Sequence, residues 1–402
     1  MRMLLKGGNV YDGQEMKVRD IIFTEEGIVS VGKEATLKDF DEAVNCMGLI
    51  VAPGLCDVHV HFREPGFEYK ETVETGSRAA AAGGYTDVCT MPNLNPPPVN
   101  MEGLQPQLKA IRANALVSVW PMGRITNSGK LADMEEIADF VAGFSDDGEG
   151  VMDEDMMKRA MEKAKTLNKL IVAHAEDTSY APEDSRSEYL QLDRDLNLVA
   201  KTGCAYHMCH VSSKESVGLI REAKKSGLDV TCETAPHYLV FTKDNLPDEG
   251  MFKMNPPIRG REDRDALIQG ISDGTVDMIT TDHAPHSIEE KSRGFQNSLN
   301  GILGLETAFP VMYTNLVEST IISIEKLFDL MSINPKKRFN IGNYEIKEGK
   351  SADFVIINPE EYFQIDSAKF KSKGRSTPFE GMLVKGRIEK TIHQGSIIYQ
   401  GE

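Results

Sequence analysis

Two histidines placed two residues apart at the end of an apolar stretch are the first residues that could carry chemistry. They lie in the segment Asp57-Val-His59-Val-His61-Phe-Arg63. Alternate side chains of an extended strand share a face, so both imidazoles are expected to point to one side. Two neutral imidazoles held in this way form a chelate suited to zinc, whereas a single buried histidine more often serves packing. The pairing favours a metal site over two core histidines.

Aspartates and histidines also end four later apolar stretches: Asp146 and Asp147, His174, His210, and Asp282 with His283 and His286. Barrels of parallel strands build their active sites at the carboxyl ends of the strands, so we expect these side chains to converge. Four histidines and two aspartates exceed what one tetrahedral ion with an open position needs, and they suit two divalent cations. Such cations lower the pKa of water towards ~7 and polarise a carbonyl, which predicts hydrolysis of an amide-type bond or its reversal.

The middle of the chain alternates apolar strands with amphipathic helices, a pattern typical of a parallel sheet. Candidate strands are Leu55–His61, Tyr85–Met91, Leu116–Pro121, Ile137–Ser145, Leu170–His174, Ala205–His210, Asp229–Thr234 and Asp277–Asp282. Helices are expected where Met157, Ala160, Met161 and Ala164 recur at helical spacing and again at about Ser213–Lys225. Eight strands are the number in a closed TIM-type (β/α)8 barrel, so we predict an α/β fold with a catalytic barrel over 51–344.

The two ends of the chain share a different pattern, short β-rich runs separated by glycine and acidic residues. Asp20–Phe23 and Gly27–Val31 lie near the start, and Ala352–Ile357, Met382–Lys385 and Ser396–Tyr399 lie near the end. Neither end can form a core alone. We therefore predict that 1–50 and 345–402 join in one small β-sandwich domain that flanks the barrel.

Charge and composition exclude several classes of partner. The 45 lysines and arginines face 62 aspartates and glutamates, a formal net charge of −17, and the summed field repels nucleic acids and anionic membranes. A small anionic substrate responds to local charge and is not excluded. No apolar run approaches the ~18 residues of a membrane span, and the start of the chain lacks a signal peptide. Six dispersed cysteines indicate reduced thiols, and together these features predict a cytoplasmic protein.

Six motifs occur in a fixed order along the chain: HVHFREPG, TMPN, AHAED, CHVSS, KMNPPIR and TTDHAPH. Together they resemble the class I dihydroorotases of the amidohydrolase superfamily. The HxH pair is shared across the superfamily, whereas Arg63-Glu-Pro-Gly66 with Met91-Pro-Asn93 is more particular to dihydroorotases. The resemblance implies zinc-dependent, reversible cyclisation of N-carbamoyl-L-aspartate to L-dihydroorotate in pyrimidine (UMP) biosynthesis.

The resemblance also implies a set of metal ligands. His59 and His61 would hold one zinc ion together with Asp282, and His174 and His210 would hold the other. Asp147 stands where many relatives carry a carboxylated lysine that bridges the two ions. A shorter carboxylate must bridge here, so two zinc ions per subunit are expected and one is the alternative. Asp282 would also act as general base and then as general acid.

Recognition of the substrate carboxylate is expected from Arg63, because a guanidinium is a forked, charge-assisted partner for a carboxylate. The resemblance implies that Asn93 and His286 complete this pocket. The alternative for Arg63 is a surface ion pair with Glu64 or Glu68. The remaining residues expected to contact substrate are His61, Asn255 and the backbone of Asn300 and Gly301, the last three reading the ring amide edges. Asn93 and Asn255 could instead be turn residues beside proline.

Two other functions are compatible with parts of the pattern. A hydrolase of hydantoins, dihydropyrimidines or allantoin would act on rings without a carboxylate, so Arg63 with Asn93 argues against it. A non-catalytic dihydroorotase-like subunit that scaffolds aspartate transcarbamoylase could lose metal ligands, yet all of them are present. Association with aspartate transcarbamoylase stays open, and the resemblance implies a homodimer. His207 is interpreted as a packing residue, and His283 as a partner of a ligand.

Overall fold

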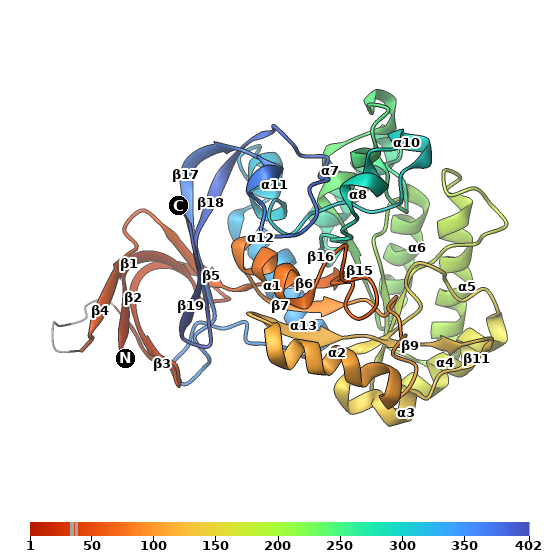
Figure 1. Ribbon diagram of the computed structural model, residues 1–402, viewed down its shortest axis with the longest axis horizontal. Helices are drawn as coiled ribbons and strands as arrows, with labels where there is room; N and C mark the ends of the chain where they lie inside the picture. Colours follow the sequence, from red (N-terminus) through yellow and green to blue (C-terminus); the bar gives the residue numbers. More distant parts are fainter. Residues whose placement is uncertain (33–35, 37–38, 402) are drawn as a thin grey trace.

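Strands from both ends of the chain form one sheet beside a barrel built by the middle of the chain, as the computed structural model shows (Figure 1). The structure describes all residues except 33–35, 37–38 and 402. Both termini lie on the sheet, at the left of Figure 1, and the barrel lies at the right. The prediction of a TIM-type barrel with a β domain from both chain ends is confirmed by this architecture.

The sheet of the chain ends has eight strands in the order β19-β18-β17-β5-β1-β2-β3, with β4 paired to β1. Their bounds are Met3–Tyr11 (β1), Met16–Thr24 (β2), Gly27–Gly32 (β3), Glu42–Asn45 (β4), Ile50–Pro53 (β5), Phe354–Gln364 (β17), Leu383–His393 (β18) and Ser396–Gln400 (β19). Phe23 of β2 and Phe354 of β17 pack edge to face at 5.4 Å, although β5 and β1 lie between them in the sheet. The sheet therefore curls over its own small core. Because β5 belongs to it, the sheet continues just past residue 50, and the predicted domain limits stay a prediction.

The barrel strands run parallel around the middle of the chain. Their bounds are Leu55–Val60 (β6), Tyr85–Thr90 (β7), Ser118–Pro121 (β8) continued by Gly123–Arg124 (β9), Gly143–Ser145 (β12), Leu170–Ala173 (β13), Tyr206–Met208 (β14), Val230–Thr234 (β15) and Met278–Ile279 (β16). The circle closes where His61 N donates to His283 O at 2.8 Å. All six residues of β6 are buried, as expected for a strand covered on both faces.

One predicted strand was wrong over most of its length. Only Gly143–Ser145 of the expected strand Ile137–Ser145 is extended, because α3 (Met134–Ile137) and a 3₁₀ turn (Ala138–Phe140) occupy its first part. Met134, Ile137 and Ala138 recur at helical spacing and are all buried. The apolar residues of the predicted strand therefore belong to two elements: the first part to the buried face of a helix and the last part to a very short strand.

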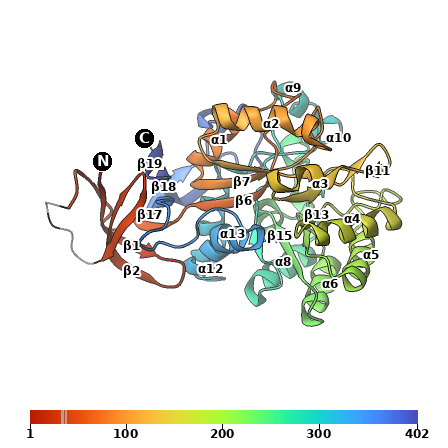
Figure 2. The same ribbon diagram turned by 90° about the horizontal axis from the view of Figure 1, so that it is seen from below.

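The helices that cover the barrel follow the sequence signals closely. Asp153 caps α4 (Glu154–Thr166) by accepting from Met156 N, and Ser213 caps α6 (Lys214–Lys225) by accepting from Ser216 N. Figure 2 shows α4, α5 and α6 on the side of the barrel far from the sheet of the chain ends. The other helices are α1 (Val73–Ala82), α2 (Met101–Asn114), α5 (Arg186–Thr202), α7 (Pro236–Val240), α8 (Arg261–Asp273), α9 (Ile288–Lys291), α10 (Gly294–Asn297), α11 (Ala308–Met312), α12 (Ile324–Phe328) and α13 (Asn334–Phe339).

The core and the cysteines complete the picture of the fold. One large apolar cluster joins the barrel to its helices, and a second fills the curl of the end sheet. All six cysteines are free and buried. Among the described residues, no helix has both the length and the apolar character needed to cross a bilayer.

Candidate metal centre and active site

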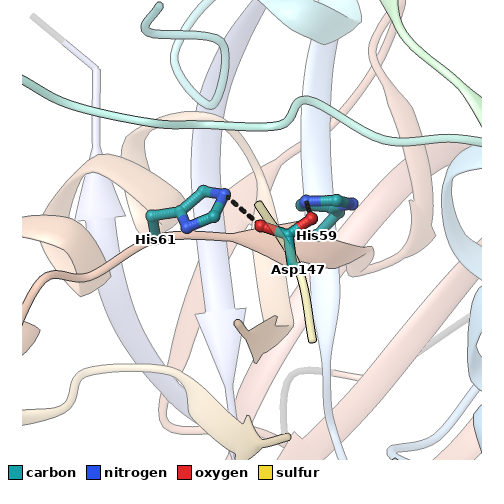
Figure 3. A group of neighbouring side chains, drawn as sticks. All are labelled: His59, His61 and Asp147. Atoms are coloured by element: carbon teal, nitrogen blue, oxygen red, sulfur yellow. Dashed lines mark ion pairs between the residues drawn. The ribbon is translucent and has the colours of Figure 1, made fainter. Parts of the chain in front are cut away.

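His59 of β6 and His61, which directly follows this strand, face the carboxylate of Asp147, as Figure 3 shows. His59 Nε2 lies 3.3 Å from Asp147 Oδ1, and His61 Nε2 lies 3.6 Å from Asp147 Oδ2. The two imidazoles share a face because they alternate along the strand. Asp147 follows the end of β12, where its backbone N donates to Ser145 Oγ at 3.1 Å. The strand pattern has thus placed three potential ligands around one point.

A second group lies on the other side of the same carboxylate. His174 follows β13 and His210 follows β14, and their facing nitrogens, Nδ1 and Nε2, are 2.7 Å apart. These nitrogens lie 3.6 and 3.7 Å from Asp147 Oδ1. Asp147 is therefore common to two possible metal-binding groups, one with His59 and His61 and one with His174 and His210. This is the placement expected of a bridging carboxylate.

Asp282, three residues after the end of β16 (Met278–Ile279), completes the first group. Its Oδ1 lies 3.1 Å from His61 Nε2 and 3.6 Å from His59 Nε2. Its backbone has φ +47°, a left-handed conformation that a non-glycine residue rarely adopts. Strain of this kind persists where the surroundings fix it, and it clusters at functional sites. The chain bends here so that the carboxylate turns towards the histidines.

The donor set fits divalent cations. His59 Nε2 and Asp147 Oδ1 are buried and have no hydrogen-bond partner within the part of the chain that the structure describes. Buried polar atoms are almost always paired, so two unpaired atoms 3.3 Å apart indicate a missing positive partner. Imidazole nitrogens and carboxylate oxygens are the ligands that zinc takes in catalytic sites. The residues expected from the sequence to hold metal therefore match the chemistry of this cluster.

The pKa shifts of Asp147 and His59 also fit a metal-binding cluster. Burial would raise the pKa of Asp147, but the charge of His59 and the nearby rings of His174 and His210 hold it well below its usual range. Burial would lower the pKa of His59, but Asp147 and Glu233 raise it well above its usual range. Without metal, the carboxylates are thus compensated by protons on the histidines. Metal binding must displace such protons, because only deprotonated nitrogens are ligands.

Behind His59 lies a further buried carboxylate, Glu233, which the sequence analysis missed. His59 Nδ1 donates to Glu233 Oε1 at 2.6 Å, and Glu233 Oε2 lies 3.0 Å from His207 Nε2. His207 Nδ1 in turn lies 2.8 Å from Thr231 Oγ1, so His207 belongs to a polar chain and does not only pack. The bond to Glu233 keeps the proton of His59 on Nδ1 and leaves Nε2 free for a metal. An acidic residue inside the short apolar strand β15 was the available sequence signal.

A cavity of about 180 Å³ opens onto both groups. It is lined by His61, Arg63, Asn93, Asp147, Gly148, His174, His210, Asn255, Asp282, Ala284, His286, Asn300 and Gly301. The structure therefore brings together every residue expected at the site; His59 alone lies behind the lining. A side chain at Gly301 would collide with Ala284, since a Cβ there would lie 2.5 Å from Ala284 O at φ +137°. Only glycine lets the backbone approach the cavity at this point.

Arg63 faces this cavity and not the surface. It is 9% exposed, and its Nε donates to Pro285 O at 3.2 Å. The alternative ion pair is wrong, because Glu64 accepts from Val73 N and Glu68 accepts from Gly66 N. Among the described residues Arg63 forms no ion pair, so its charge is available to a ligand.

The two asparagines contact the candidate metal ligands, Asn93 directly and Asn255 through Glu176. Asn93 Oδ1 lies 2.9 Å from His61 Nδ1, so this amide orients a histidine and also lines the cavity. Asn255 Nδ2 donates to Glu176 Oε2 at 2.9 Å, and the same oxygen lies 2.9 Å from His174 Nε2. Their alternative interpretation as mere turn residues does not account for these contacts.

Comparison with known proteins adds the family. A sequence profile of the amidohydrolase family matches residues 50–398. A dihydroorotase from Bacillus cytotoxicus is 41% identical, and one from Bacillus cereus is 42% identical; each alignment covers 100% of this chain and 99% of the relative. The chain belongs to the dihydroorotases of the amidohydrolase family. A solved structure of an L-hydantoinase (dihydropyrimidinase) from Arthrobacter aurescens has a TM-score of 0.92 at 25% identity, covering 100% of this chain and 96% of the other.

Three other histidines of this dihydroorotase-family chain lie outside the cavity. His283 follows Asp282 but turns towards Glu71, with Nε2 3.5 Å from Glu71 Oε2. His237 is buried beside the site, and burial lowers its pKa to about 4, so the ring is neutral. His393 lies in the end sheet, 2.7 Å from Asp353. None of these three rings lines the cavity.

Proposed function

We propose that the protein catalyses the reversible cyclisation of N-carbamoyl-L-aspartate to L-dihydroorotate at this cavity, with zinc as the metal. The observation that carries the proposal is that the unpaired cation of Arg63 and both metal-binding groups face the same small cavity. A ring that bears a carboxylate beside a hydrolysable amide needs both features at once. Membership of the dihydroorotases supports the same reaction.

The metal would be held as the sequence indicates: His59, His61 and Asp282 on one side, His174 and His210 on the other, and Asp147 between them. When bound, divalent cations at these positions lower the pKa of water and polarise a carbonyl oxygen. Two zinc ions per subunit are proposed because Asp147 is shared by two groups of ligands. One ion is the alternative that elemental analysis distinguishes.

Asp282 is proposed as the proton carrier. Burial would raise its pKa, but the charges of His59 and His61 and a hydrogen bond from His61 hold it below its usual range. The carboxylate is therefore ionised at neutral pH and can accept a proton from the attacking water in hydrolysis. It then delivers this proton to the leaving ring nitrogen, and in cyclisation it takes the proton from the carbamoyl nitrogen.

Substrate orientation is proposed for the rest of the lining. Arg63, Asn93 and His286 would receive the ring carboxylate, with the guanidinium providing a charge-assisted pair. Asn255 and the backbone of Asn300 and Gly301 would meet the ring amide edges. Hydantoins and dihydropyrimidines lack that carboxylate, so an unpaired buried arginine favours dihydroorotate over them.

The test is an assay in both directions with purified protein. We expect interconversion of dihydroorotate and carbamoyl aspartate that is lost after chelation and returns with zinc. Hydrolysis should decline at low pH as Asp282 becomes protonated, and cyclisation should decline at high pH. No turnover of dihydroorotate by fully zinc-loaded protein, or turnover of hydantoin in its place, would refute the proposal.

Three further proposals concern the setting of the enzyme: a place in pyrimidine (UMP) biosynthesis, a cytoplasmic location and a homodimer. The free, buried cysteines support a reducing compartment. The homodimer and an association with aspartate transcarbamoylase rest on the family resemblance. Light scattering of the purified protein, alone and mixed with aspartate transcarbamoylase, tests both.

A further inference from the structure

A group of charged side chains lies behind the His286 ring, outside the residues that line the cavity. Lys70 Nζ lies 3.1 Å from His286 Nδ1 and 3.2 Å from Glu290 Oε1. Tyr69 Oη donates to the same Glu290 oxygen at 3.0 Å. The side chains of Lys70 and Glu290 are only 11% and 14% exposed. This group joins the segment after β6 to the segment that contains α9.

The contacts of His286 fix its tautomer. Its Nε2 lies 2.7 Å from Asn300 O, and a carbonyl oxygen can only accept, so Nε2 carries the proton. His286 Nδ1 lies 3.1 Å from Lys70 Nζ and 3.3 Å from Glu290 Oε2. In the neutral ring Nδ1 is an acceptor, and of these two neighbours only Lys70 can donate to it. Burial, followed by the charges of Arg63 and Lys70, lowers the pKa of His286 to about 3, which agrees with a neutral ring.

Glu290 has a structural task close to the substrate pocket. Its Oε2 accepts from Ser287 N at 3.0 Å, and its own backbone N donates to Ser287 Oγ, so it closes the capping box of α9. Its negative charge also acts on Arg63: burial lowers the pKa of that guanidinium, and the charges of Asp282, Asp147 and then Glu290 oppose the shift. A carboxylate here would compete with a substrate carboxylate for the field of Arg63.

Lys70 is placed to cancel that charge. Its ammonium group sits between Glu290 and the His286 ring, and it also lies 5.5 Å from the centre of the Tyr69 ring and 5.8 Å from that of Phe67. These neighbours surround the ammonium group of Lys70. With Lys70 present, the group of Arg63, Lys70 and Glu290 carries one net positive charge; without it, the net charge is zero.

We propose that Lys70 is a positioning residue that determines specificity for an anionic ring: it neutralises Glu290 and holds His286 as the neutral Nε2–H tautomer, which leaves the charge of Arg63 to the substrate carboxylate. Lys70 itself does not touch the substrate. The inference rests on the proposed function, because it concerns the carboxylate of dihydroorotate. The substrate carboxylate is remote from the reacting amide. Weaker binding of this carboxylate therefore destabilises the bound substrate and the transition state equally, which raises KM and leaves kcat nearly unchanged.

The experiment compares zinc-loaded wild-type protein with Lys70→Met, Lys70→Arg, Glu290→Gln and the double variant Lys70→Met/Glu290→Gln, using dihydroorotate as substrate. Lys70→Met should raise KM about tenfold and change kcat by less than about threefold. Lys70→Arg, which keeps the charge, should stay within about threefold of the wild-type KM. The double variant should return to within about threefold of the wild-type KM, since the charge to be cancelled is gone.

Each outcome separates the inference from the proposed function. Wild-type protein that does not turn over dihydroorotate removes the proposed function itself. Active wild-type protein with an unchanged KM in Lys70→Met overturns the inference alone, and so does a double variant as impaired as Lys70→Met. If Lys70→Met does not fold, Glu290→Gln decides: the inference predicts an equal or lower KM, and a KM raised tenfold or more contradicts it.

Discussion

The two ends of the barrel each contain a buried ionic cluster, and the clusters differ in how completely they are paired. At the amino-terminal end, Lys336 Nζ bonds Gly54 O at 2.7 Å and Asn343 O at 2.9 Å and lies 3.2 Å from Asp87 Oδ2. Asp87 Oδ1 accepts from Trp120 Nε1 at 3.2 Å. At the carboxyl-terminal end, His59 Nε2 and Asp147 Oδ1 remain without a hydrogen-bond partner in the described chain.

The completeness of hydrogen-bond pairing distinguishes the structural cluster from the functional one, whereas burial and charge do not. Both clusters are buried, and each contains an aspartate beside a basic side chain, Lys336 in one and His59 in the other. A fully paired cluster leaves nothing to bind, whereas an unpaired buried atom is costly unless a ligand completes it. The comparison predicts that changes at one end act on stability and changes at the other act on metal and activity.

The largest effect is expected for Asp147→Asn. It removes one anionic oxygen from both metal-binding groups, so turnover of dihydroorotate should fall roughly 10³-fold or more and metal content should drop. The neighbouring variant Asp146→Asn is the matched control, because Asp146 pairs with Arg124 and with the backbone at Ile125 and lies outside the cavity lining. Steady-state kinetics with elemental analysis of both variants provides the measurement. Full metal content in Asp147→Asn would break the comparison.

Lys336→Met should act at the other end with the opposite signature. It leaves the carboxylate of Asp87 buried without its cation, which should cost about 3–5 kcal/mol of unfolding free energy. Zinc content and the KM for dihydroorotate should stay at wild-type values in the fraction that folds. Denaturant unfolding and elemental analysis test the two halves of this expectation. A variant of unchanged stability would show that the paired cluster is not structural.

Glu233→Gln sharpens the comparison within the metal end. Glu233 holds His59 by its Nδ1 proton, and loss of such a partner typically weakens metal binding about 10–100-fold. Competition with a chromophoric chelator measures the affinity without reference to turnover. Asp195→Asn is the control, since Asp195 is equally buried but pairs with Tyr206 and Arg194. Equal zinc affinity in wild type and Glu233→Gln would remove the orienting role.

The smallest effect concerns pH and the junction of the sheet with the barrel. Burial would raise the pKa of Asp353, but hydrogen bonds from His393 and Gln394 N lower it to about 2. Because the folded-state pKa is depressed, this contribution to stability is full above pH ~4 and is lost as pH falls towards 2. Asp353→Asn should therefore lose on the order of 1–2 kcal/mol at pH 7 and show a flatter acid limb in unfolding experiments. If the unfolding free energies of wild-type protein and Asp353→Asn decline in parallel as the pH falls, the prediction is wrong.

The barrel and most of the candidate site could be predicted from the sequence because both depend on local patterns. Apolar runs marked the strands, and most candidate metal ligands stood at or just beyond the end of a run. The convergence of the candidate ligands could be predicted because carboxyl ends of parallel strands meet at one face, whereas their division into two groups came from the family resemblance. The pattern failed at Ile137–Ser145, where helical and extended apolar residues follow one another without a break.

Residues that act through another side chain were beyond the reach of these patterns. Glu233 is 174 positions from His59, and Lys70 is 216 positions from His286, so only the folded barrel brings each pair together. His207 was interpreted as a packing residue because it lies on the strand before His210, whereas its partners Glu233 and Thr231 lie on the adjacent strand. Cross-strand pairing, and not local spacing, determines such contacts.

The most direct test of the account is anomalous diffraction at the zinc edge from crystals of the zinc-loaded protein. The account predicts scattering centres on both sides of Asp147, one against His59 and His61 and the other against His174 and His210. Zinc bound elsewhere on the protein, with this cavity free of any anomalous signal at full loading, would contradict it.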